Sequence, residues 1–343
     1  MKFTIVGAGA IGGVAAGFLA RAGHDVTVVD KVVEHVEAIN AAGLHLGGAT
    51  DLTARVPALL PEQVSAPLGT VLLAVKAHDT EAALAPVAPH LGSSECVVSL
   101  QNGLEEYTIA RVIGAARTVG AFLTFGAHYE APGRVVYGGE GSLRIGELDG
   151  ATSPRLLSLR EALAAIQPLD ITDNIFGYLW GKEALGSVYF ATALVDADVP
   201  EIIDHPRYRP LLADLCAETV QVAEALGVRV EAFDGFDPKA MRFGQRDPRA
   251  VEAAWAGQRQ YWLSHVQRRT GVWRDLAIRK RKTEAEAQIG TVLREADRTG
   301  VPVPRNRAVY QLIREIEAGQ RGFGWDNLDM VRRAAEQPVA VSR

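Results

Sequence analysis

The sequence predicts an α/β fold: a doubly wound sheet domain over residues 1–169, followed by an all-α domain over residues 170–343. Short apolar runs typical of strands alternate with helical stretches up to about residue 169, which indicates a mostly parallel sheet with helices on both faces. From residue 175 onward, long helical periodicities dominate and strand signals vanish. A chain of 343 residues is also long enough for two domains.

The first twelve residues carry the most specific pattern. An apolar strand-like run over residues 2–6 leads into the motif G-x-G-x-x-G at residues 7–12, and a helical stretch follows over residues 11–22. In a Rossmann-type turn the first glycine permits the tight turn, the second lets the backbone approach a pyrophosphate, and the third lets the helix pack against the strand. Free N–H groups and the positive dipole end of the helix favour phosphate. The predicted dinucleotide-binding residues are Gly7, Gly9, Ala10, Ile11 and Gly12.

Asp30 follows the second predicted strand, residues 25–29, and lies 23 residues after Gly7. This is the place of the acid that hydrogen-bonds the adenosine ribose 2′-hydroxyl, and its charge repels a 2′-phosphate. We therefore predict NAD(H) as the favoured cofactor. Lys31, the next residue, offers a cation to a 2′-phosphate, so NADP(H) is the alternative. The other interpretation of Asp30 is a solvated turn acid.

Further strands and helices are predicted along the first domain. Apolar runs predict strands over residues 70–75, 96–100, 118–121 and 134–137, and helical stretches cover residues 80–88 and 104–113. Residues 120–148 are rich in β-formers and punctuated by glycine, so we expect outer strands with antiparallel hairpins that close this domain.

Ligands of doubly wound sheets bind beyond the carboxyl ends of the strands. Lys76 follows one predicted strand and can reach the ribose, the pyrophosphate or a substrate anion. Asn102 follows the next strand and can hydrogen-bond a substrate hydroxyl or the nicotinamide side. The alternatives are structural: Asp79 or Thr80 as a helix N-cap, and Asn102-Gly103 as a turn.

Composition excludes several classes of partner. The net charge of −5 argues against nucleic acid, and the short basic run 279–282 is typical of a solvated helix end or an anion site. The apolar N-terminal run continues as a βαβ pattern rather than a signal peptide, and no apolar run is long enough for a membrane span. Cys96 and Cys216 are expected to be reduced core thiols, and no metal site is predicted. We expect a cytoplasmic enzyme that acts on a small-molecule substrate. A homodimer is the expected assembly, because it is the commonest closed assembly of one chain.

Five motifs, in order, resemble those of the ketopantoate reductases, the 2-dehydropantoate 2-reductases, over nearly the whole chain. The similarity extends to residues 298–306, which resemble a late proline- and asparagine-containing segment of that family. The motifs are G-A-G-A-I-G-G at 7–13, V-K-A-H-D-T at 75–80, Q-N-G at 101–103, W-G-K at 180–182 and R-K-T-E-A-E at 281–286.

The resemblance implies NAD(P)H-dependent reduction of the carbonyl of a 2-keto acid. It implies that Lys182 is the general acid that protonates the carbonyl oxygen, and that Glu284 hydrogen-bonds at the reacting hydroxyl. It also carries the family's binding roles to Lys76 and Asn102. Without the resemblance, Lys182 would be interpreted as a Lys whose stem lies along an amphipathic helix.

The sequence departs from the family at the expected substrate contacts. The family's Lys is usually followed by Asn four and eight residues later, where this chain has Gly186 and Phe190. Arg274 stands in a block that is serine-rich in the family and is a candidate partner for the substrate carboxylate.

A segment over residues 237–269, with Tyr261, Trp262 and His265, is expanded relative to the family and is either an extra packing helix or part of a larger pocket. The alternatives to a ketopantoate reductase are therefore a related NAD-dependent dehydrogenase for a bulkier or aromatic substrate and, from another class, a non-catalytic dinucleotide-sensing protein.

Overall fold

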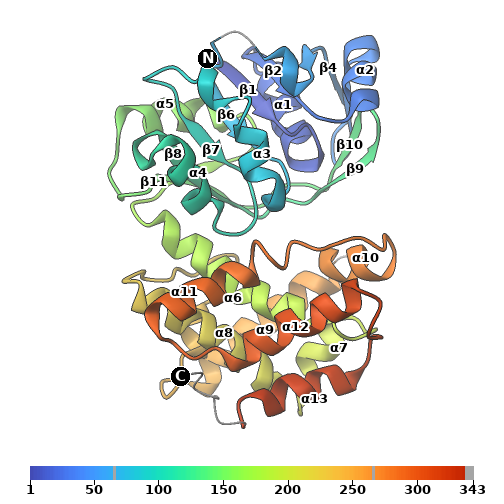
Figure 1. Ribbon diagram of the computed structural model, residues 1–343, viewed down its shortest axis with the longest axis vertical. Coiled ribbons are helices and arrows are strands. Elements are labelled where there is room, and N and C mark those ends of the chain that lie inside the picture. Colours follow the sequence, from blue (N-terminus) through green and yellow to red (C-terminus); the bar gives the residue numbers. More distant parts are fainter. Residues whose placement is uncertain (65–66, 265–266, 337–343) are drawn as a thin grey trace. The chain divides into compact units, whose positions relative to one another are not determined.

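The computed structural model describes residues 1–64, 67–264 and 267–336 and divides into two compact units, Met1–Ile175 and Phe176–Arg343. The first is an α/β unit and the second is helical, so the predicted fold class is confirmed (Figure 1). We predicted a boundary between residues 169 and 170, which falls within the last strand of the first unit. That strand, β12 (Leu169–Ile171), pairs with β11 (Leu143–Glu147) of the main sheet and lies within the first unit.

The main sheet of the first unit has eight strands, and neighbouring strands are parallel except for β8 and β11. Because β1 lies between β2 and β6, the order of strands reverses there, and the carboxyl ends of β1, β2, β6 and β7 share one edge. That edge is where doubly wound sheets bind ligands. The sheet order is β12, β11, β8 (Thr118–Leu123), β7 (Val97–Ser99), β6 (Thr70–Leu73), β1 (Lys2–Val6), β2 (Asp25–Val29) and β5 (Ala58–Leu59).

A second sheet of four strands corrects one prediction. The strand over residues 134–137 was expected at the edge of the main sheet; instead β9 (Ala127–Ala131) and β10 (Arg134–Tyr137) form a hairpin that joins β3 (Leu44–Gly48) and β4 (Leu52–Ala54). The antiparallel outer strand predicted within residues 120–148 is present as β11, which pairs with β8.

The second sheet packs against glycines of α1 (Ala10–Arg21). A Cβ atom on Gly17 would lie 2.6 Å from Leu46, and one on Gly13 would lie 3.0 Å from Val135. These two helix glycines are visible in the sequence, but their pattern does not predict the second sheet.

The helices of the first unit include one that is shorter than predicted. Residues 80–88 were expected to be helical, but α3 ends at Leu84, two residues before Pro86, because proline removes a backbone donor and clashes with the preceding turn. The remaining helices are α2 (Val33–Ala42), α4 (Glu105–Ile113) and α5 (Pro154–Leu163).

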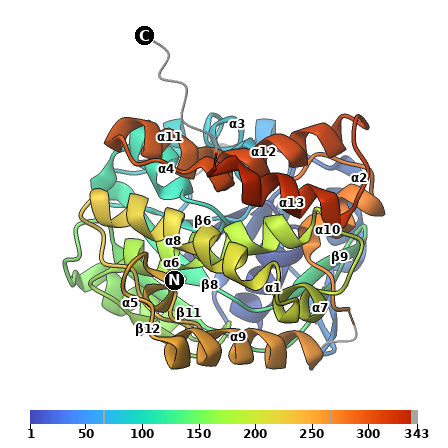
Figure 2. The same ribbon diagram turned by 90° about the horizontal axis from the view of Figure 1, so that it is seen from below.

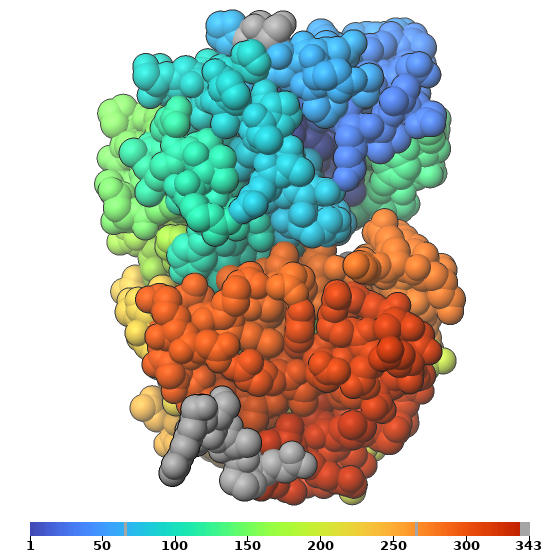
Figure 3. Space-filling model, in the orientation of Figure 1, coloured from blue at the N-terminus to red at the C-terminus, as the bar shows by residue number. Residues whose placement is uncertain are grey.

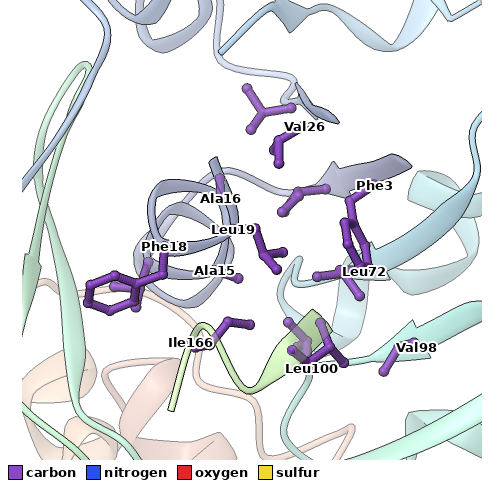
Figure 4. Close-up of a cluster of buried hydrophobic side chains, with 14 of the residues drawn as sticks. Phe3, Ala15, Ala16, Phe18, Leu19, Val26, Leu72, Val98, Leu100 and Ile166 are labelled. Carbon is purple, nitrogen blue, oxygen red and sulfur yellow. The ribbon is translucent and has the colours of Figure 1, made fainter. Parts of the chain in front are cut away.

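The core between α1 and the main sheet fixes the start of that helix. Phe3 of β1, Leu72 of β6 and Leu19 of α1 are fully buried and lie together with Ala15 and Leu100 (Figure 4). Each large apolar side chain contributes about 1.5–3 kcal/mol on burial. The packing therefore holds α1 against the sheet with its N-terminus directly after β1.

The second unit is built of helices, apart from an isolated bridge between Phe233 and Phe236 in its described part. Figure 2 shows α6 and α8 between α9 on one side and α12 with α13 on the other. In the described ranges no helix is long and apolar enough to cross a bilayer. The helices are α6 (Ile175–Thr192), α7 (Val199–Asp204), α8 (Arg209–Ala225), α9 (Pro248–Leu263), α10 (Gly271–Ala277), α11 (Ile289–Thr299), α12 (Pro304–Glu317) and α13 (Trp325–Ala334).

A buried carboxylate joins α8 to the start of α12. Glu218 is 1% exposed and accepts hydrogen bonds from the backbone N–H and the side-chain amide of Asn306, both at 3.0 Å, and from the backbone N–H of Arg305 at 3.2 Å. Burial raises the pKa of Glu218, and these hydrogen bonds oppose the shift. The late segment that resembles the family thus holds two helices together.

Candidate active site

Two glycines of the N-terminal loop have no room for a side chain. Gly7 has φ +92°, and a Cβ atom there would lie 2.8 Å from both Cγ1 and N of Val75, two residues after β6. A Cβ atom on Gly12 would overlap the carbonyl oxygen of Gly7. The turn from β1 into α1 is therefore as tight as the glycine motif predicts.

Gly9 differs, because a Cβ atom there would meet nothing within 4 Å. It is the N-cap of α1 without a side-chain cap, and the first turn of the helix carries no acid. Ala10 and Ile11, the first helical residues, are partly exposed. Open space at the backbone of Gly9, next to uncapped helix amides, fits the pyrophosphate of a dinucleotide. Figure 3 shows a hollow in the first unit, with the dark-blue N-terminal segment visible between blue and cyan segments.

Asp30 holds the glycine loop in addition to any role toward a ligand. Its Oδ2 accepts a hydrogen bond from the Ala8 N–H at 2.8 Å, and its Oδ1 accepts one from the Val32 N–H at 2.9 Å. Buried His35 lies 2.8 Å from the Ala8 carbonyl through Nε2, and its Nδ1 accepts from the Gly133 N–H at 2.9 Å. Nε2 must therefore carry the proton and donate to Ala8. Two side chains from the segment after β2 thus fix the backbone on both sides of Ala8, through its N–H and its carbonyl.

Sequence reasoning missed His35, because a lone histidine on a helix carries no signal that it reaches a loop 27 residues earlier. Lys31, predicted as a cation next to Asp30, is in an ion pair: its Nζ lies 2.8 Å from Oδ2 of Asp79. Asp79 occupies the N-cap position of α3, as the structural alternative expected, but its side chain accepts no hydrogen bond from the helix.

The loops after β6 and β7 are tied together by Gln101. Its amide nitrogen donates to the carbonyl of Val75 at 3.1 Å and to Oγ1 of Thr80 at 2.8 Å. Asn102 is exposed next to this anchor, and Lys76 is exposed at the end of the neighbouring strand. The structure therefore brings Asp30, Lys76 and Asn102 to the same edge of the sheet. Gln101 belongs to the Q-N-G motif, but the motif alone does not predict that its side chain anchors the two loops.

In the second unit, Lys182, Gly186 and Tyr189 share one face of α6, since residues four and seven apart on a helix lie above one another. Lys182 is half-buried. A Cβ atom on Gly186 would have ordinary contacts only, 3.6 Å from Oε1 of Gln288 and 3.8 Å from Oε2 of Glu183. The face beside Lys182 therefore has space at Gly186, next to a side-chain amide from another segment.

Glu284 lies in the segment between α10 and α11 and is half-buried. Its backbone carbonyl accepts from the Gln288 N–H at 3.0 Å, so Gln288 lies one helical turn further along. The segment is anchored by Thr283, whose N–H and hydroxyl both donate to Oε1 of Glu317 on α12 at 2.7 Å. Oε1 of Gln288 lies 3.6 Å from the place that a Cβ atom on Gly186 would take, so the turn of Glu284 lies beside the Lys182 face of α6.

Tyr189 connects this face to the expanded segment. Its hydroxyl donates to Oε1 of Gln258 at 2.5 Å and accepts from Nε1 of Trp262 at 3.1 Å, both on α9. Burial raises the pKa of the Tyr189 phenol. The expanded segment thus forms a helix packed on α6, and His265 lies outside the described residues. Phe190, one residue further, is 1% exposed and packs inside the unit; its contact with substrate stays a prediction.

Arg274 lies on α10, which Figure 3 shows in orange at the surface of the helical unit. Its Nε is buried and has no hydrogen-bond partner among the described residues. The adjacent Asp275 accepts instead from Arg279 at 2.7 Å and pairs with Arg281 at 3.0 Å. Burial, followed by repulsion from Arg279, lowers the pKa of Arg274. A guanidinium in this state would gain from an anionic ligand.

Comparison with known proteins assigns both units. The family model described as Ketopantoate reductase PanE/ApbA matches residues 3–150, and the model described as Ketopantoate reductase PanE/ApbA C terminal matches residues 174–317. A 2-dehydropantoate 2-reductase of Mesorhizobium japonicum is 32% identical over 258 residues, which cover 67% of this chain and 78% of that protein. The chain belongs to the ketopantoate reductase family.

Solved structures of similar chains have the same two-part fold. A PanE/ApbA family ketopantoate reductase of Ralstonia eutropha is 30% identical, with a TM-score of 0.77 over 93% of this chain and 99% of that chain. D-mandelate dehydrogenase, solved with NADH and anilino(oxo)acetate, shares the fold at 21% identity, with a TM-score of 0.80 over 94% of this chain and 100% of that chain. The family resemblance of the motifs is confirmed. As a member of this family, the chain is an oxidoreductase whose cofactor is a nicotinamide dinucleotide.

Proposed function

We propose that this protein reduces the carbonyl of a 2-keto acid with NADH. Family membership supports the reaction class. The observation that carries the proposal is the loop itself: two glycines that exclude any side chain surround a third whose backbone faces open space at a helix N-terminus. The proposed cofactor-binding residues are those of the loop together with Asp30, Lys76 and Asn102.

When bound there, a nicotinamide dinucleotide supplies the hydride. The loop and Asp30 bind and orient the cofactor. Lys182 holds a proton at Nζ and donates it to the substrate oxygen, and its positive charge stabilises the negative charge that develops on that oxygen. Glu284 accepts a hydrogen bond from the hydroxyl that forms. We assign the substrate carboxylate to Arg274, whose buried Nε supports a bidentate contact.

NADH is the proposed cofactor in preference to NADPH, because the Asp30 carboxylate accepts ribose hydroxyls and repels a 2′-phosphate. Dissociation constants for NADH and NADPH, measured by nucleotide fluorescence, test this directly. Asp30→Asn keeps a hydrogen-bond acceptor for the Ala8 N–H and is expected to narrow the difference between the two constants. Tighter binding of NADPH than NADH by the unmodified protein would contradict the preference.

The substrate is either 2-dehydropantoate, as the names of the relatives imply, or a bulkier 2-keto acid. Space at Gly186 favours the second candidate, since a glycine there leaves room where a side chain would otherwise lie. An assay of NADH oxidation with ketopantoate, pyruvate, branched 2-keto acids and benzoylformate distinguishes the two. A site whose polar groups hydrogen-bond one substrate reacts much more slowly with a substrate that leaves those groups unpaired, so the rates should differ strongly between these keto acids.

The role of Lys182 is tested by Lys182→Met, with Lys239→Met as a matched control in the same unit. Loss of a general acid lowers kcat by about 10²- to 10⁴-fold. We expect this loss for Lys182→Met and none for Lys239→Met. Unchanged turnover in Lys182→Met would refute the assignment. Cofactor binding without turnover of any substrate would favour the dinucleotide-sensing alternative.

We also propose that the protein is a homodimer and that it works in the cytoplasm. A homodimer is the commonest closed assembly of a single chain, and light scattering measures it. The two cysteines, Cys96 and Cys216, are buried free thiols, which is consistent with the reducing cytoplasm.

A further inference from the structure

The ion pair between Lys31 and Asp79 joins two loops at the edge of the main sheet where the cofactor is proposed to bind. Lys31 follows β2 directly after Asp30, and Asp79 lies in the turn after β6. The Lys31 ammonium is 2.8 Å from Oδ2 of Asp79, and the two side chains are 70% and 28% exposed. The pair is therefore accessible to a solute rather than sealed in the core.

Asp79 has no evident structural task for its carboxylate. It precedes α3 but makes no side-chain cap there, and its backbone N–H donates to the Lys76 carbonyl at 2.8 Å. Thr80 stabilises this turn instead, through its hydroxyl bond of 2.7 Å to the carbonyl of Ala77. Besides Lys31, the carboxylate has His78 near it, with Nε2 at 3.7 Å. The main interaction of the Asp79 carboxylate is thus the ion pair with Lys31.

We propose that Asp79 is a specificity-determining residue that excludes cofactors with a 2′-phosphate by occupying Lys31. This rests on the proposed function in one respect: the adenosine ribose must bind at Asp30. An ammonium next to that position would otherwise attract the phosphate dianion. With Asp30 on one side and Asp79 on the other, the three side chains carry a net charge of −1, and the phosphate would have to compete with Asp79 for the ammonium.

Neutralising Asp79 both frees Lys31 and removes a repulsive charge, while the hydroxyl contacts of NADH at Asp30 stay the same. An exposed ion pair contributes little to stability, so the substitution leaves the fold intact. Substitution of Asp79 should therefore change the ratio of NADPH to NADH affinity and leave the melting temperature unchanged.

The experiment measures dissociation constants of NADH and NADPH for the full chain by nucleotide fluorescence, in unmodified protein, Asp79→Asn, Lys31→Gln and the double variant. We expect Asp79→Asn to tighten NADPH binding about tenfold, equivalent to about 1.4 kcal/mol, and to change NADH binding less than about threefold. In the Lys31→Gln background the gain should largely vanish. Glu81→Gln is the matched control, since Glu81 is an exposed carboxylate two residues away that pairs with Arg111.

The proposal is overturned by no gain in NADPH affinity in Asp79→Asn, by an equal gain in the Lys31→Gln background, or by an equal gain in Glu81→Gln. Parallel weakening of both cofactors with a lower melting temperature would also overturn it, because it would make Asp79 a structural residue. If the unmodified protein binds neither cofactor, the proposed function fails and this inference with it. That outcome is distinct, since it appears before any substitution is compared.

Discussion

The glycine loop allows fold and ligand binding to be separated by two substitutions three residues apart. Gly9→Ala places a Cβ atom where nothing lies within 4 Å, whereas Gly12→Ala places one onto the carbonyl oxygen of Gly7. The same Cβ atom on Gly12 would also lie 3.1 Å from Cβ of Ala74. Gly9→Ala should therefore act mainly on the binding of what enters the open space, whereas Gly12→Ala should also lower the stability of the protein through a steric overlap.

The expected magnitudes follow from these contacts. For Gly12→Ala, overpacking costs about 1–3 kcal/mol or more, and the higher helix propensity of alanine returns up to about 1 kcal/mol. We expect a net destabilisation of about 1–2 kcal/mol together with loss of cofactor binding. For Gly9→Ala, the change of an N-cap costs about 0.5–1 kcal/mol, and the new methyl group blocks the approach of a pyrophosphate. NADH affinity should fall at least about tenfold, which is about 1.4 kcal/mol.

Urea unfolding followed by circular dichroism and NADH titration followed by fluorescence measure the two effects on the same preparations. Gly126→Ala is the control, because Gly126 also has open space around its Cβ position and lies outside the loop. It should change neither measurement. NADH binding by Gly9→Ala equal to that of the unmodified protein, or a stability of Gly12→Ala equal to that of Gly126→Ala, would contradict these expectations.

Three further substitutions test the helical unit. Tyr189→Phe removes the hydroxyl that bonds Trp262 and should lower the free energy of unfolding by about 1–3 kcal/mol in urea, since a buried donor loses its acceptor. Glu218→Ala leaves the buried donors at the start of α12 without an acceptor; we expect a loss of about 3–5 kcal/mol by the same measurement, and a loss below 1 kcal/mol would contradict it. Arg274→Ala should raise KM for a 2-keto acid at least about tenfold with little change in kcat, whereas Arg279→Ala should not, and equal effects would exclude a specific carboxylate contact.

Much of the cofactor half could be predicted from the sequence, because its residues are neighbours in the chain and backbone geometry dictates their type. A positive φ at Gly7 and the contact of Gly12 with the loop admit no other residue, so the motif and the structure carry the same information. The predicted position of Asp30 after β2 follows from the same unit. Its bond to the Ala8 N–H was not predictable, since it depends on how the loop folds back over the strand end.

The second sheet was not predictable in the same way. Its strands come from two segments about 80 residues apart, and β3 pairs with β10 in parallel. Each strand alone is short and ambiguous, so only the packing against α1 makes them a sheet. The glycines of α1 that face this sheet are visible in the sequence, but glycine in a helix does not say what approaches it.

The helical half shows why a substrate is harder to predict than a cofactor. At Gly186 the space left by the absent side chain is shaped by residues from elsewhere in the chain. Gln288, about 100 residues later, lies at the edge of that space. Tyr189 likewise acquires its polar partners from α9, in the expanded segment. No local motif encodes such pairs, because helix periodicity specifies which face is buried but not which helix covers it. The motif around Lys182 therefore predicts the chemistry of this face, whereas we expect α9 and the Glu284 segment to limit which substrate can reach it.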